Sequence, residues 1–200
     1  MERIRPHTKP LGMLEWESVA RGFLASDALL KAAEVEILAL RPVTPGRFVA
    51  LFTGSVEAVR ESLGAGAACA RDEVRDSLFL AQPHPDLVRV LRGRKAEVVS
   101  QSVGIIETTS LCSALLAADG AAKCALVRLL EIRLGMGLGG NAFVTLAGPQ
   151  SDVESALAVG EKLARERGYH RSTVLIPNPD QRLRKAFEEP VAPFSDFTSG

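Results

Sequence analysis

The sequence is short of aromatic residues and of net charge, and each shortage narrows the range of possible functions. Aromatic residues make up 5% of the 200 residues, and 24 basic residues balance 24 acidic ones, so the formal net charge is zero. Nucleic-acid-binding proteins usually carry a basic excess, and attraction to anionic membranes needs basic clusters. We therefore expect no nucleic acid and no membrane among the partners, whereas a low net charge favours self-association.

Long apolar runs are also missing. No stretch reaches the length of about 18 apolar residues that a transmembrane helix needs, and residues 1–10 lack the apolar core of a secretory signal. The three cysteines, Cys69, Cys112 and Cys124, have no metal-ligand spacing. We expect them to be small buried side chains of a cytoplasmic protein in a reducing environment.

What the sequence does have is an internal repeat of roughly 90 residues. Residues 11–15 match residues 103–107 at an offset of 92, and the offset grows to 94 and then 96 in later segments. The order of matches is kept throughout, so chance similarity is a poor explanation. Matched pairs include Ser18 and Ser110, Asp27 and Asp119, Lys31 and Lys123, Arg41 and Arg133, Gly54 and Gly148, and Leu80 and Ile176.

Each copy is predicted to have the order β-α-β-β-α-β followed by a short helix. Strands are expected at 11–15, 35–40, 48–52 and 76–81, and at 103–107, 126–134, 142–146 and 173–176. The first helix of each copy shows apolar residues at helical spacing, including Val19, Phe23, Leu29, Leu111 and Leu115. Later helices are expected at 56–70, 86–91, 151–168 and 181–187, with Ser55 and Ser151 near N-cap positions.

This pattern predicts an α+β fold, in which each copy forms an antiparallel four-stranded sheet with helices on one face. The predicted domains are residues 8–94 and 100–189. A short polar link, about 93–100, joins them. Residues 190–200, which contain proline, serine and glycine, are predicted to be a loose tail.

Three stretches of each copy together carry a family resemblance. The first copy reads Leu-Gly-Met-Leu-Glu, then Ala-Ser-Asp-Ala-Leu-Leu-Lys-Ala-Ala, then Val-Glu-Ile-Leu; the second reads Val-Gly-Ile-Ile-Glu-Thr, Ala-Ala-Asp-Gly-Ala-Ala-Lys and Leu-Gly-Met-Gly-Leu-Gly-Gly. These stretches resemble the shell-protein domain of bacterial microcompartments, in the direct and not the permuted order of elements. The resemblance covers most of the chain.

The resemblance implies a structural protein of the microcompartment shell, with no catalytic residues, metal or cofactor. Members of this family form flat hexagonal tiles, and fused pairs form trimers that mimic a hexamer. We therefore expect a homotrimer that meets other shell proteins edge to edge and passes small metabolites through a central pore.

The resemblance also implies which residues line the pore, namely the loop after the second strand of each copy. These residues are Val43, Thr44, Pro45, Gly46, Met136, Gly137, Leu138, Gly139 and Gly140. Glycine suits such loops because tips that crowd around an axis need small side chains and unusual backbone angles. A plain flexible hairpin is the alternative. A phosphate-binding loop is excluded because the Gly-Lys-Ser/Thr ending is missing.

The propanediol-utilisation type of tandem shell protein is the nearest subtype by resemblance. In that subtype a cysteine at the loop tip can hold an iron–sulfur cluster, and Thr44 takes its place here. A hydroxyl is not a thiolate ligand, so we expect a polar ring in place of a cluster. Nearby Arg47 is a candidate for adding positive charge at one mouth of the pore.

The resemblance places Lys31 and Lys123 at the tile edge, although an isolated helix lysine is ordinarily just solvated. Gln82 and Asn178 stand where the family's edge turn carries an arginine, so the edge contact here lacks that charge.

Two functions from other classes compete with the tile. One is a redox or cofactor-carrying trimer for electron transfer, which a thiol at the pore loop would favour. The other is a ligand-binding sensor or enzyme built on duplicated α/β units. Glu15 and Glu107 recur at the end of the first strand, where a structural role competes with a catalytic carboxylate pair.

Overall fold

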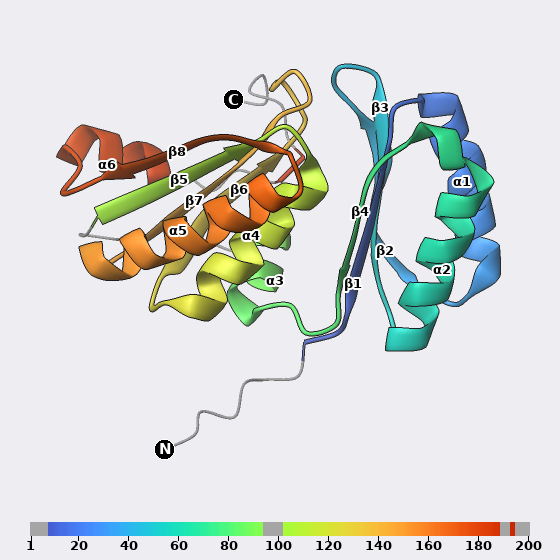
Figure 1. Cartoon of the computed structure of the whole chain (residues 1–200), viewed down its shortest axis with the longest axis horizontal. Helices are drawn as coiled ribbons and strands as arrows, with labels where there is room; N and C mark the ends of the chain where they lie inside the picture. Colours follow the sequence, from blue (N-terminus) through green and yellow to red (C-terminus); the bar gives the residue numbers. More distant parts are fainter. Residues whose placement is uncertain (1–7, 94–101, 189–192, 195–200) are drawn as a thin grey trace. The chain divides into compact units, whose positions relative to one another are not determined.

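The structure is a computed structural model that describes residues 8–93, 102–188 and 193–194. The contacts divide the chain into two compact units, Met1–Pro85 and Asp86–Gly200, and each unit contains one four-stranded sheet (Figure 1). Most of the predicted link after Gly93, and the predicted tail apart from residues 193–194, lie outside the described residues.

The first unit has the predicted order of elements. Its sheet order is β2-β3-β1-β4, and every neighbouring pair of strands is antiparallel. Helices α1 and α2 lie together on one face of this sheet (Figure 1). The elements are β1 (Leu11–Trp16), α1 (Val19–Ala32), β2 (Glu36–Val43), β3 (Arg47–Thr53), α2 (Val56–Cys69) and β4 (Val74–Leu80).

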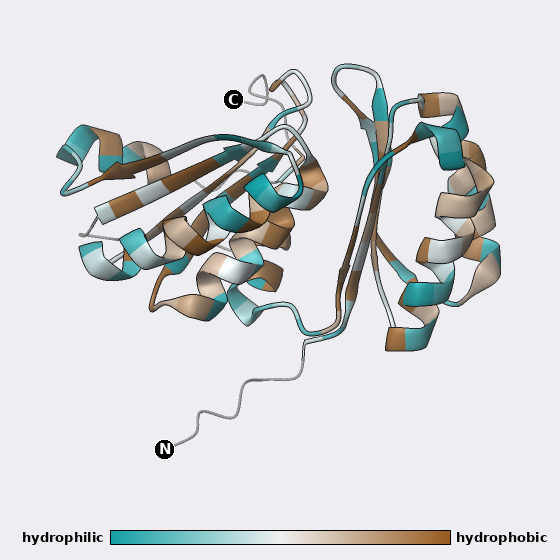
Figure 2. Cartoon of the chain, viewed as in Figure 1, coloured by the Kyte–Doolittle hydropathy of each residue, from teal (hydrophilic) through white to brown (hydrophobic). Residues whose placement is uncertain are grey.

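The core of the first unit lies between this sheet and its helices. Leu14, Trp16, Leu29 and Phe52 are fully buried in it, and the ring of Trp16 lies 6.3 Å from that of Phe48. The largely hydrophobic colour of β1 in Figure 2 reflects this burial. Each large apolar side chain buried in this way contributes about 1.5–3 kcal/mol.

The second unit repeats the architecture, with the sheet order β6-β7-β5-β8. Its helices pack closely, because a Cβ added at Gly160 would come within 2.4 Å of Ile106 Cδ1 and 3.2 Å of the Ala117 carbonyl oxygen. The elements are β5 (Ser102–Thr108), α4 (Leu111–Cys124), β6 (Arg128–Leu134), β7 (Ala142–Gly148), α5 (Gln150–Glu166), β8 (His170–Ile176) and α6 (Gln181–Glu188). The predicted α+β unit is thus confirmed, and predicted bounds differ from these by at most three residues.

Helix α3 (Pro85–Leu91) closes the first repeat in sequence, but from Asp86 onward it belongs to the second unit. There its side chains bind both backbone polar groups of Leu129 in the edge strand β6. Asp86 Oδ2 accepts a hydrogen bond from Leu129 N at 2.7 Å, and Arg89 Nη2 donates to the Leu129 carbonyl oxygen. Arg89 Nε lies 2.6 Å from Asp86 Oδ1. Side chains of α3 therefore satisfy backbone groups that a sheet edge leaves open.

Two details of the prediction were wrong, and one apolar residue at helical spacing lies outside the core. Phe23 is 56% exposed, and its ring lies 4.5 Å from that of Phe48 between centroids. Ser151 is not the N-cap, because α5 begins directly after Pro149; Ser55 does cap α2 by accepting from Ala58 N at 3.1 Å. Of the cysteines only Cys112 is buried, whereas Cys69 and Cys124 are exposed at helix ends.

Candidate pore loops and edge residues

The loop between β2 and β3 is a tight turn with an exposed tip. Val43 is 3% exposed and is paired with Arg47 in the ladder, so the accessible part is Thr44, Pro45 and Gly46. Gly46 has φ 112° and its amide donates to the Val43 carbonyl oxygen at 3.0 Å. Such a positive φ favours glycine, and it permits the reversal at this point.

The corresponding loop of the second unit, between β6 and β7, is longer and built mainly of glycine. Positive φ values occur at Gly135, Gly137, Gly139 and Gly140. The loop is ordered by its own backbone, since the Gly135 amide donates to the Asn141 carbonyl oxygen at 3.1 Å. Gly137 and Gly139 are exposed, Met136 and Leu138 are half-buried, and Gly140 is buried.

Four charged residues form a cluster at the base of the first loop. Arg47 lies 3.3 Å from Glu15 Oε1 through Nη1 and 3.0 Å from Glu17 Oε2 through Nε. Arg75 Nη1 lies 2.5 Å from Glu17 Oε1, and its Nε lies 3.5 Å from Glu15 Oε1. The Glu15 side chain is fully buried, so its charge depends on both arginines. Arg47 is therefore neutralised locally and is only 14% exposed.

The pKa of Glu17 is set by burial and by the two arginines, which act in opposite directions. Burial by itself raises this pKa, but the hydrogen bond from Arg75 and the charge of Arg47 outweigh burial, so the pKa lies below its ordinary value. Glu17 is thus held as a carboxylate, which suits a structural ion-pair cluster and not a proton donor.

The second unit keeps only part of this cluster. Arg171 Nε lies 3.1 Å from Glu107 Oε1, and Asn141 stands where the first unit has Arg47. A different pair, Arg133 and Glu131, lies on β6 at 3.2 Å. Burial raises the pKa of Glu131, although the charge of Arg133 opposes the shift. Glu15 and Glu107 each face an arginine, an arrangement that favours the structural role over a catalytic pair.

The predicted edge lysines make the same kind of ion pair in the two units, although the Asp27 side chain is 59% exposed and that of Asp119 only 5%. Lys31 Nζ lies 2.6 Å from Asp27 Oδ2, and Lys123 Nζ lies 2.5 Å from Asp119 Oδ2. Both pairs join residues one helical turn apart near the end of a helix. Gln82 and Asn178 are exposed.

The turn at Asn178 has a neighbour that sequence reasoning missed. Asn178 has φ 48°, and Arg184 Nη2 donates to its Oδ1. Arg184 Nε also donates to the Pro179 carbonyl oxygen at 2.8 Å. A guanidinium from α6 therefore lies at this turn, whereas the first repeat has Val88 at the matching position.

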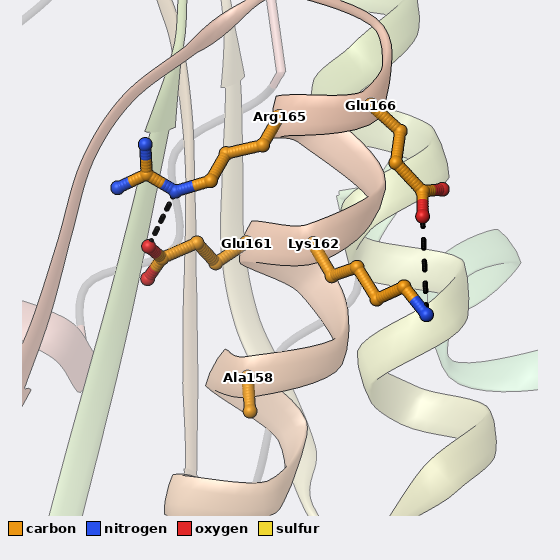
Figure 3. Close-up of a pocket in the computed structure, with 5 residues that line it drawn as sticks. All are labelled: Ala158, Glu161, Lys162, Arg165 and Glu166. Carbon is orange, nitrogen blue, oxygen red and sulfur yellow. Dashed lines mark hydrogen bonds and ion pairs between the residues drawn. The ribbon is translucent and has the colours of Figure 1, made fainter.

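A hollow of about 470 Å³ lies on the outer side of α5, and sequence reasoning did not find it. Its lining consists of ion pairs along one helix, with Arg165 Nε 2.7 Å from Glu161 Oε1 and Lys162 Nζ 3.8 Å from Glu166 Oε1 (Figure 3). The pKa of Glu161 is lowered by the hydrogen bond from Arg165. Because its charged groups pair with each other, this hollow has the character of a solvated helix face.

The described residues hold neither a metal site nor a membrane-spanning helix. Within 8–93, 102–188 and 193–194, no three histidine, cysteine or acidic side chains are placed to hold a metal ion. In the same part of the chain no helix has the length and apolar character to cross a membrane.

Two copies of one antiparallel β-α-β-β-α-β unit in a single chain define the class as a tandem-domain α+β protein. The model of the BMC domain family matches residues 10–83 and 102–179. The chain therefore belongs to this family and is a tandem-domain shell protein of bacterial microcompartments, which is a structural and not an enzymatic role.

Similar proteins agree with this assignment. The bacterial microcompartment shell protein PduT of Citrobacter freundii is 34% identical over 91% of this chain and 99% of its own length. The shell protein PduA of the same organism is 32% identical over 40% of this chain and 89% of its own length. A crystal structure of a microcompartment protein from Desulfitobacterium hafniense superposes with a TM-score of 0.79 at 43% identity, covering 89% of this chain and 99% of that one.

Proposed function

We propose that three copies of this chain form a tile of six BMC domains, with the two kinds of loop alternating around a central pore for small metabolites. The observation that carries the proposal is the pair of loops themselves. Both follow the second strand of their repeat, and both place exposed positive-φ glycines at the tip. Tips of this kind leave room for six loops to approach one axis.

The lining of the proposed pore is polar and carries no unpaired charge from Arg47. In the trimer three Thr44 hydroxyls form one ring, while the Gly137 and Gly139 backbones form the other. Arg47 is engaged by Glu15 and Glu17, so it adds no net positive field at the mouth. By the logic of narrow pores, in which width and lining groups set passage, this lining suits small polar metabolites.

The proposed tile meets other shell proteins at its edges, where Lys31, Lys123, Gln82 and Asn178 lie. Both lysines recur at matched positions next to an aspartate, which supports two similar edges per chain. Electron microscopy of the concentrated protein tests the tile, and hexagonally ordered sheets or tubes are expected. Discrete particles that never tile, even when mixed with single-domain shell proteins, would contradict it.

A cross-linking experiment tests whether the loop tips converge. In a background with Cys69 and Cys124 changed to serine, Thr44→Cys should be joined into three-chain species by a reagent with three short maleimide arms. Gly64→Cys is the matched control, because Gly64 is an exposed position on α2 with nothing within 4 Å of an added Cβ. Equal yields of three-chain species from both variants would refute the pore assignment of Thr44.

A further inference from the structure

The two units carry charges of opposite sign at one pair of matched positions. Glu36 is the first residue of β2 and Arg128 is the first residue of β6, and the repeat matches them at an offset of 92. Each of the two side chains is 57% exposed. Both strands begin a few residues after the helix that carries Lys31 or Lys123, each of which is paired with an aspartate. The exposed charge is therefore reversed beside the two proposed edge lysines.

The edge of the first unit carries an excess of acid. This first edge consists of Lys31, Glu34, Glu36 and Gln82. Glu36 Oε2 lies 3.4 Å from Lys9 Nζ, but both side chains are more than half exposed, so this ion pair is weak and can be exchanged for another partner. Glu34 is also exposed and adds a further acidic group.

The edge of the second unit carries an excess of base. This second edge consists of Lys123, Leu126, Arg128 and Asn178. Leu126 stands where the first edge has Glu34, so one acidic group is missing. Arg128 Nη1 lies 3.6 Å from Asp86 Oδ1, but the same oxygen accepts from Arg89 Nε at 2.6 Å. Asp86 is thus shared between two arginines and leaves a net positive charge.

The turn at Asn178 adds to this positive charge. Arg184 donates to uncharged oxygen atoms of the turn, and the neighbouring Asp180 lies 3.0 Å from a second arginine, Arg182. Two arginines therefore accompany a single aspartate. The matching turn of the first unit has the uncharged Gln82 and no arginine at the position that matches Arg184.

The geometry of the proposed tile makes the pairing of unlike edges unavoidable in a sheet of this chain alone. The two kinds of edge alternate around a hexagonal outline, so opposite sides of a tile are unlike. Neighbours of the same orientation meet through one edge of each kind, and neighbours of opposite orientation meet through like edges. Because only two orientations exist, two of any three tiles that meet at a corner share one. Like contacts alone cannot fill a sheet, whereas unlike, heterologous contacts can.

We propose that the first edge of one tile pairs with the second edge of its neighbour, so that all tiles of a sheet share one orientation. The inference rests on the proposed function, which supplies the tile and its alternating edges. Opposite charges favour this contact, whereas like edges would bring acid against acid or base against base. Two second edges would also join their exposed Leu126 side chains, but only by placing Arg128 and Arg184 of both tiles together.

The experiment measures the lowest protein concentration at which sheets form, by sedimentation and electron microscopy at low ionic strength. Glu36→Arg places a base on the first edge, and Arg128→Glu places an acid on the second. Each single change brings like charges together on every side of a tile, so we expect this concentration to rise by at least about tenfold. The double variant exchanges the two charges and should form sheets at the wild-type concentration. Added salt should dissolve wild-type sheets.

Glu166→Arg is the matched control and should leave the concentration unchanged. The Glu166 side chain is 58% exposed, close to the value for Glu36, but it lies in the last turn of α5, away from the second edge. Light scattering checks that each variant keeps the molar mass of the wild type, and circular dichroism checks the fold. Arg128→Gln brings no acid next to Asp86 and should raise the concentration less than Arg128→Glu does.

Four results would overturn the inference. If both single variants tile like the wild type, these charges do not join the edges, while the proposed function stands. If the double variant tiles no better than the single ones, the two charges do not face each other. Averaged images in which neighbouring tiles have opposite orientations would show that like edges meet. If the wild type never forms sheets, the inference and the proposed tile are both refuted.

Discussion

Asp86 offers a sharp test of how far the free energy of unfolding depends on a single buried carboxylate. This side chain holds helix α3 against the edge strand β6. The Asp86 side chain is 5% exposed and accepts from Leu129 N at 2.7 Å and from Arg89 Nε at 2.6 Å. In Asp86→Ala the Leu129 amide loses a charged acceptor, a loss of about 1.5–3 kcal/mol, and Arg89 keeps a nearly buried charge with less compensation. We expect a loss of about 3 kcal/mol in the free energy of unfolding.

The assay is denaturant unfolding at one fixed protein concentration, since self-association makes stability depend on concentration. Deuterium uptake by a peptide that covers β6 should rise in parallel, because α3 no longer protects that strand. Asp180→Ala is the control, since the Asp180 side chain is 58% exposed and pairs with an exposed arginine. An unfolding midpoint for Asp86→Ala equal to that of the control would refute the reasoning. Changing Asp86 and Arg89 together should cost less than the sum of the single changes.

Three further changes probe the packing, the pore loop and the charged cluster. Gly22→Ala should destabilise the chain by about 1–3 kcal/mol, because the new Cβ would lie 2.3 Å from Phe48 Cβ; denaturant unfolding measures it, and an unchanged midpoint would contradict the packing. Gly139→Ala should cost only about 1–2 kcal/mol, since φ is 59° but nothing lies within 4 Å, and light scattering should still show the assembly of the wild type. Glu17→Gln should lower the melting temperature at neutral pH, and its difference from wild type should vanish as the pH falls well below the ordinary Glu17 pKa of 4.5. Because the folded-state pKa of Glu17 is lowered, its stabilising contribution is complete above the ordinary value and is lost as the pH falls through the lowered pKa. A difference that grows in acid would therefore contradict this reasoning.

The fold could be predicted from the sequence because each strand and helix pattern occurs twice, once in each repeat. The matched strands at 11–15 and 103–107, and the helical spacing of apolar residues, identify the same elements twice. Exposure was not predictable in the same way. Phe23 sits on the apolar period of α1 yet lies outside the core, because periodicity gives the direction of a side chain and not what covers it.

The candidate site could be predicted from the sequence only in part. The glycine-rich loops could be located from their composition, and the structure finds positive φ at Gly46, Gly137 and Gly139; that they converge at a pore remains a prediction. The charged cluster could not be found, since Glu15 and Arg75 are distant in sequence and meet only when β1 pairs with β4. The contact of Asp86 with Leu129 is equally hidden, because it joins the end of one repeat to a strand of the other.

The two repeats diverge clearly at the end of the sheet that carries the loops. The ion pairs of Asp27 with Lys31 and of Asp119 with Lys123 are kept in both units, although the edge turn has Gln82 in one and Asn178 in the other. The loops, in contrast, differ in length and chemistry, and Arg47 of the first unit is Asn141 in the second. A ring of six identical single domains must change all six loops at once. A fused chain can change three loops and keep the other three, so in the proposed trimer the pore can combine a ring of hydroxyl groups with glycine tips while both kinds of edge keep the lysine–aspartate pair.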